Sequence, residues 1–182
     1  MRESLSKLLR WWLPWTLAVS AMGLALADEK HALQIDRDEL VVYCDAIWPA
    51  DVAHVRETLR SGIAMTVIWH LTLSRSRQYW PDEEIADIEV VRHVRPDLLS
   101  RRWVLEDRST GIVRSVNRLN EAISFLTRLR HYPVVDRSLL ESGQLYDLEV
   151  SLQSFDGKQM EGWWRRLLRG DDFTASLSFR EP

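Results

Sequence analysis

The fold is decided by the stretch GIAMTVIWHLTLSRSR, Gly62 to Arg77, the longest run of strictly alternating hydrophobicity in the chain. Alternate residues of a β-strand point to opposite faces, so a strand that buries one face shows this period of two. The face expected to be buried holds Ile63, Met65, Val67, Trp69, Leu71 and Leu73. The opposite face holds Ala64, Thr66, Ile68, His70, Thr72 and Ser74. The stretch therefore predicts a long, half-buried central strand in an antiparallel sheet.

Shorter segments with the same alternation lie on both sides of this strand and are separated by turn residues. Strands are expected over 32–36, 39–47, 85–95, 98–107, 112–116, 144–155 and 173–179. In the second of these, Leu40, Val42 and Cys44 share the face expected to be buried. In the fourth, the alternation already begins at Leu98 and Leu99.

Two segments have the spacing of amphipathic helices. Residues 52–61 form the first, with Asp51 as its N-cap and Gly62 just beyond its end. Asn117 is the expected N-cap of the second, whose apolar residues run from Leu119 to Leu129 and stop before the sequence His-Tyr-Pro at 131–133. Hairpin-spaced strands without regular β-α-β alternation indicate a mainly β, antiparallel sandwich in the immunoglobulin-like style, with two short helical connections. The Cys…Trp…Cys pattern of true immunoglobulin domains is absent.

The first 27 residues have the composition of a secretory signal peptide. Three basic residues precede the nearly apolar segment 11–26, and Ala25-Leu26-Ala27 is an A-x-A cleavage pattern. The alternative is an uncleaved anchor, since 17 apolar residues are just enough to span a bilayer. We therefore expect residues 28–182 to form a single β-sandwich domain, either periplasmic or tethered to the inner membrane by the N-terminal segment.

Charge and cysteine content narrow the function classes. The chain carries a net charge of −3, and removing residues 1–27 takes away a net +2, which leaves −5. A mildly acidic domain is a poor binder of nucleic acid, because phosphate contacts need a clustered basic surface. Cys44 is the only cysteine, so the chain has no internal disulfide and depends on its packed core.

Several local motifs resemble one bacterial family, the "domain of unknown function 4390" family of exported proteins, over Asp28 to Phe179. They are Leu59–Ile63 (LRSGI), Tyr79–Asp82 (YWPD), Leu99–Trp103 (LSRRW), Leu119–Ile123 (LNEAI), Tyr146–Val150 (YDLEV) and Asp172–Ser176 (DFTAS). These are core, turn and helix positions and carry no chemistry of their own. The resemblance implies a cell-envelope protein of undefined activity and a link to a membrane sensor kinase.

The sequence assigns no catalytic, cofactor-binding or metal-binding residue. The five histidines lack the H-E-x-x-H type of spacing, and Cys44 has no local base to activate it, so we interpret it as a small buried hydrophobe. An acidic cluster (Asp82, Glu83, Glu84 and Asp87) lacks the spacing of a calcium loop and is interpreted as a solvated loop. We expect no bound cofactor.

Trp163, Trp164, Arg165 and Arg166 are the predicted contact residues, because arginines beside partly covered aromatic rings suit a protein interface or an anionic membrane surface. We therefore expect a non-enzymatic interaction or accessory domain with an envelope protein as its partner. The first alternative is a glycan-binding module with Trp80 and Trp103 side by side on one face. The second is a hydrolase that uses strand-borne carboxylates or Cys44.

Overall fold

The computed structural model describes residues 32–49, 52–157 and 172–182, and it is mainly β. Its strands pair antiparallel in two sheets, one of three strands in the order β1-β2-β7 and one of six in the order β6-β5-β4-β3-β8-β9. The elements are β1 (Leu33–Arg37), β2 (Val41–Ile47), α2 (Val52–Arg60), β3 (Met65–Arg75), β4 (Glu83–Asp97), β5 (Arg102–Asp107), β6 (Ile112–Val116), α3 (Leu119–Thr127), β7 (Arg128–Asp136), the short helix η1 (Arg137–Leu139), β8 (Leu145–Asp156) and β9 (Phe173–Arg180). The predicted fold class, antiparallel sheets with two helical connections, is confirmed.

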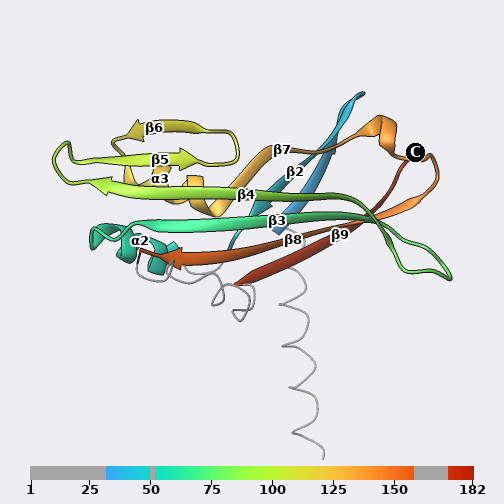
Figure 1. Ribbon diagram of the computed structural model, residues 1–182, viewed down its shortest axis with the longest axis horizontal. Coiled ribbons are helices and arrows are strands. Elements are labelled where there is room, and N and C mark those ends of the chain that lie inside the picture. Colours follow the sequence, from blue (N-terminus) through green and yellow to red (C-terminus); the bar gives the residue numbers. More distant parts are fainter. Residues whose placement is uncertain (1–31, 50–51, 158–171) are drawn as a thin grey trace, which may run out of the picture. The chain divides into compact units, whose positions relative to one another are not determined.

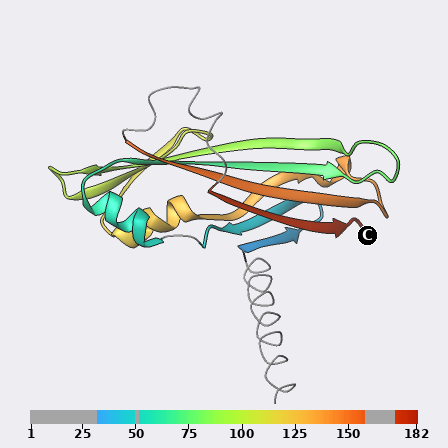
Figure 2. The same cartoon turned by 90° about the horizontal axis from the view of Figure 1, so that it is seen from below.

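The three-stranded sheet and both helices form a second layer against one face of the six-stranded sheet (Figures 1 and 2). Helix α3 contacts β4 and β5, helix α2 contacts β3, and β1 and β7 contact β9 and β4. The arrangement is sandwich-like, and among the described strands β6 and β9 are the two ends of the six-stranded sheet. Within the described ranges, no helix is long and apolar enough to cross a bilayer.

Strand β3 is the centre of the large sheet, as its alternation predicts. It pairs with β4 on one side and with β8 on the other, and Trp69 lies opposite Val90 and Leu152. Its inward residues, from Met65 to Leu73, are at most 1% exposed. The other face is more covered than expected near the start of the strand, where Thr66 and Ile68 are buried too.

Strand β8 supplies the second half of this core. Its inward residues are fully buried, as its period of two predicts; they are Tyr146, Leu148, Val150 and Leu152. The ring of Trp69 lies among the buried residues of the core, and its Nε1 donates a hydrogen bond to the carbonyl oxygen of Leu126, at 3.2 Å. The central strand is therefore joined to α3 by a polar contact as well as by packing.

Helix α3 is shorter than the sequence predicts. It ends at Thr127, and Leu129 and His131, which were expected in or just after the helix, belong to β7. The chain becomes extended there because β7 pairs with β2, so Leu129 is buried in a sheet instead of on a helix. At the other end the N-cap residue is Arg118 and it makes no side-chain cap bond, so the assignment of Asn117 as the cap was wrong.

Two strands begin later than the alternation predicts, which leaves three leucines exposed in the turns before them. Leu40 is 72% exposed because β2 begins only at Val41, and the residues before it form a turn in which Asp38 accepts the N–H groups of Leu40 and Val41. Likewise β5 begins at Arg102, so Leu98 and Leu99 lie in a turn and not in a strand. Alternating hydrophobicity alone does not show at which residue the hydrogen-bonded pairing of a strand begins.

Arg92 interrupts the apolar face of β4, and the structure gives the reason. Its Nη1 donates to the carbonyl oxygens of Phe125 and Arg128, at 2.8 and 2.6 Å, and its guanidinium lies over the Phe125 ring. These carbonyls lie where α3 ends and β7 begins, and such groups at the end of a helix lack partners in the helix itself. Asp107, 3.7 Å away, supplies the opposite charge. Burial lowers the pKa of Arg92, and Asp107 opposes that shift.

Candidate functional site

The predicted contact residues Trp163, Trp164, Arg165 and Arg166 lie outside the described residues, as does the segment 1–27. Their interface role stays a prediction. The remaining sequence-based candidates fall on described elements and can be compared with the structure.

Trp80 and Trp103 are not brought together. Trp80 lies in the loop before β4, whereas Trp103 pairs with Pro96 near the other end of that strand. The loop after β3 and the turn after β4 lie at opposite ends of the sheet (Figure 1). About thirteen residues of β4 separate the two positions, roughly 40 Å at the usual rise of a strand. The two rings do not form the common platform that a glycan-binding module would require.

Cys44 is a buried residue of β2 and not an activated nucleophile. It is 0% exposed, and burial together with the charge of Asp45 raises its pKa to about 12. The four histidines among the described residues sit on four different elements: His54 on α2, His70 on β3, His93 on β4 and His131 on β7. His93 is hydrogen-bonded to Thr66 Oγ1 at 2.9 Å, and burial, followed by the charge of Arg108, lowers its pKa.

This placement predicts that the Cys44 thiol is almost inert in the folded protein. At pH 8 we expect labelling by a thiol-specific disulfide reagent at least about a thousandfold slower than for a free cysteine of ordinary pKa. Labelling should become fast once urea unfolds the chain, which provides the internal control. Because the folded pKa is raised, stability from this group is complete below the ordinary cysteine pKa and is lost as the pH rises toward about 12. Fast labelling in native buffer would contradict the assignment.

The acidic cluster is engaged by arginines and only partly lies in a loop. Glu83 begins β4 and forms ion pairs with Arg75 and Arg77, and Asp82 accepts the N–H of Arg77 at 3.1 Å. The Arg75 guanidinium is the main cause that lowers the pKa of Glu83. In the part of the chain that the structure describes, no three His, Cys, Asp or Glu side chains come together as metal ligands.

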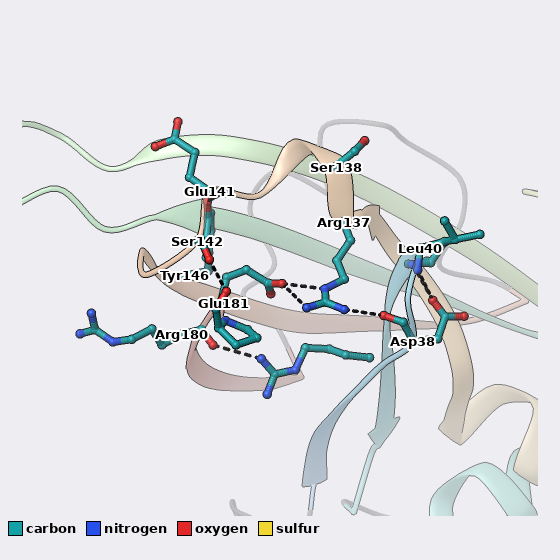
Figure 3. Close-up of polar contacts among 12 residues, drawn as sticks. Asp38, Leu40, Arg137, Ser138, Glu141, Ser142, Tyr146, Arg180 and Glu181 are labelled. Carbon is teal, nitrogen blue, oxygen red and sulfur yellow. Dashed lines mark hydrogen bonds and ion pairs between the residues drawn. The ribbon is translucent and has the colours of Figure 1, made fainter.

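A polar clasp joins the two sheets at the end of the domain where β9 finishes (Figure 3). We define the Arg137–Glu181 clasp as these two side chains and the backbone of Asp38. Nε and Nη2 of Arg137 both lie 2.6 Å from Glu181 Oε1, and Nη1 donates to the carbonyl oxygen of Asp38 at 2.9 Å. One guanidinium thus holds the end of β9 and the turn between β1 and β2.

The clasp is buried and is continued by backbone contacts. Glu181 is 5% exposed, and its Oε2 is buried without a hydrogen-bond partner. Nearby, Arg37 donates to the carbonyl oxygen of Arg180, and Arg180 donates to that of Gly143. No local sequence pattern predicts the clasp, because Arg137 and Glu181 are 44 residues apart. Its geometry is that of a structural contact that holds the two sheets together.

The turn between β4 and β5 exposes apolar side chains next to positive charge. We define the hairpin tip as Leu98, Leu99, Arg101 and Arg102. Leu98 is 77% exposed and Leu99 is 99% exposed. Asp97 holds the turn by accepting the N–H groups of Leu99 and Ser100 and the Ser100 hydroxyl, the last at 2.7 Å. The leucines are therefore presented on a fixed turn.

Beside these leucines the surface is hollowed into a pocket of about 280 Å³. Leu59 and Arg60 of α2, Pro96 of β4 and Trp103 of β5 contribute to its lining. Arg60, Arg101 and Arg102 are exposed, and among the described residues none of them has an ion-pair partner. The tip thus combines a projecting apolar pair, an adjacent hollow and three arginines, which outnumber the one carboxylate of the lining, Asp97.

The fold and these surfaces define a two-sheet antiparallel domain with fixed, exposed loops. A family model described as a domain of unknown function (DUF4390) matches residues 29–179. The chain belongs to this family, as its motifs indicate. Neither a curated protein nor a solved structure matches the chain.

Proposed function

We propose that this protein is a non-enzymatic accessory domain of the cell envelope that acts by docking on a partner protein through the hairpin tip. The single observation that carries the proposal is the full exposure of Leu99 beside Leu98 on a turn held by Asp97. Burying a leucine side chain stabilises a complex by about 1.5–3 kcal/mol, so two uncovered leucines are a strong source of binding energy.

The chemistry of the tip favours a protein over a lipid surface. A membrane contact needs only the projecting leucines and the arginines. The tip adds a hollow lined by Trp103 and Pro96, which suits an apolar side chain of a partner, and tryptophan and arginine are the residues most enriched at binding hot spots. The expected partner surface therefore presents an apolar side chain next to carboxylates that pair with Arg101 and Arg102.

Site-specific crosslinking in living cells tests this docking role. With a photo-crosslinking amino acid at position 99, we expect one discrete protein adduct, and the substitutions Arg101→Glu and Arg102→Glu together should reduce it at least tenfold. Position 139 is the matched control, since Leu139 is also an exposed leucine, at 62%, but lies in η1 away from the tip in sequence. Adducts that form equally from both positions, or only lipid adducts from position 99, would overturn the proposal.

The double substitution Leu98→Asp with Leu99→Asp provides a second test of docking through the hairpin tip. We expect it to reduce formation of the adduct, detected from a crosslinker placed at Arg102, at least tenfold. The free energy of unfolding should change by no more than about 0.5 kcal/mol, because both side chains are exposed. Unchanged adduct formation would show that the leucines are not the contact.

Trp163, Trp164, Arg165 and Arg166 form the second segment of the proposed interface, and the support for them is their sequence alone. Replacing all four by alanine is expected to weaken association with the same partner, or with the membrane. Unchanged association with both would remove this segment from the proposal while leaving the hairpin tip untouched.

A further inference from the structure

A second pocket, of about 420 Å³, lies where the end of β2 meets the two helices. The backbone fixes this junction, because the N–H of Trp48 donates to the carbonyl oxygen of Thr127 at 2.9 Å and Ile47 pairs with Arg128. The volume is within the range of about 300–1,000 Å³ that is typical of small-molecule sites. Its lining includes Ile47, Trp48, Val52, Arg56, Ile123 and Arg128.

Trp48 lines this pocket, so its indole N–H can report on a change there. The residue is 4% exposed, and its Nε1 is buried without a partner. The other core tryptophan, Trp69, donates its Nε1 to Leu126.

The charges around the pocket favour an anion. Arg56 is half-buried and Arg128 is exposed, and neither has an ion-pair partner among the described residues. The described lining contains no acidic side chain. Arginine binds carboxylates through a planar fork of donors, and these two are therefore free to hold one. Ile47, Val52 and Ile123 provide an apolar wall beside them.

We propose that this pocket binds a small amphiphilic carboxylate, whose apolar body lies against Ile47, Val52 and Ile123. Arg56 and Arg128 hold the carboxylate, and the indole of Trp48 borders the same pocket. This role is additional to docking at the hairpin tip and does not depend on it. It makes the domain a sensor or carrier of an amphiphile as well as a docking module.

Octanoate is the probe for the test. The full chain, labelled with ¹⁵N at its tryptophan indoles, is titrated with octanoate, and the Trp48 signal is identified by its loss in Trp48→Phe. Of the nine tryptophans, we expect a saturable shift centred on Trp48. Arg56→Gln and Arg128→Gln are each expected to weaken binding about tenfold, which calorimetry also measures if Trp48→Phe does not fold.

The matched control is Arg130→Gln, a change on the same strand as Arg128 at an exposed residue that does not line this pocket. It should leave the affinity unchanged, and 1-octanol, which lacks the charge, should bind at least tenfold more weakly. Three results would overturn the proposal: no saturable Trp48 shift, equal binding of the alcohol, or an equal loss of affinity in Arg130→Gln. Phosphatidylglycerol vesicles should leave the Trp48 signal in place, and a shift with vesicles alone would assign the pocket to membrane lipid instead.

Discussion

Replacing Trp69 by alanine is expected to lower the free energy of unfolding by about 3–5 kcal/mol, the usual cost of truncating a large buried aromatic residue. Trp69 is 0% exposed, lies between Val90 and Leu152 in the sheet, and reaches Leu126 at the end of α3. The variant loses packing in the large sheet and also leaves the Leu126 carbonyl unpaired. Urea denaturation followed by far-ultraviolet circular dichroism measures the change without relying on tryptophan emission.

Trp69→Phe separates the two contributions. Phenylalanine keeps an aromatic ring at this position but cannot donate to Leu126, so we expect a loss of about 1–3 kcal/mol for the carbonyl left without its partner. An alanine variant that is no less stable than the phenylalanine variant would contradict the assignment of Trp69 to the packed centre of the domain.

Replacing Arg137 by leucine is expected to lower the free energy of unfolding by about 3 kcal/mol, because it leaves the Glu181 carboxylate buried without its counter-charge. Glu181 is the more buried member, with 7% of its side chain exposed against 29% for Arg137. The loss of stability should therefore come mainly from the unpaired Glu181 carboxylate and less from the removed contact.

The double variant Arg137→Leu with Glu181→Leu tests that reason. Replacing both members of a buried ion pair by apolar residues is often close to neutral. We expect the double variant to recover most of the stability lost in Arg137→Leu alone. The part that is not recovered comes from the Asp38 carbonyl, which has lost the hydrogen bond from Arg137. A double variant as unstable as the sum of both single variants would show that the pair acts through other contacts.

The central features of the fold could be predicted because they depend on local periodicity. The alternation of 62–77 places β3 in the middle of the sheet, and that of 144–155 fixes the buried face of β8. Both strands bury a continuous row of side chains, so the period of two is strong over many residues. The left-handed backbone at Gly111, where φ is +72°, is a local feature too, because glycine adopts it without steric cost.

The boundaries that failed depend on pairing with distant segments. Leu129 continues the helical spacing of α3, yet it lies in β7 because β2 provides an edge to pair with. Leu98 and Leu99 continue the alternation of β5, yet the Asp97 side chain closes a turn there. In both cases a tertiary or side-chain hydrogen bond outweighs the local pattern.

The candidate surfaces were only partly accessible from sequence. The exposed leucines had a detectable signal, since Pro96-Asp97 followed by Ser100 is a turn sequence. The amphiphile pocket draws its residues from β2, α2, α3 and β7, and the clasp joins β1, η1 and β9. No local pattern connects such segments, so only the three-dimensional arrangement shows them.

Strand β6 ends the large sheet among the described strands, and four of its five residues are exposed, including Ile112 at 60% and Val113 at 62%. An open apolar edge of this kind invites addition of a strand from another copy of the chain, and thus aggregation. Arg114, in the middle of β6, reaches over the Phe125 ring, with 5.6 Å between its guanidinium carbon and the ring centre. A charge turned inward from an edge strand is one of the devices by which natural sheets resist such growth. This arginine therefore serves as a gatekeeper of solubility at the β6 edge of the sheet, beside helix α3.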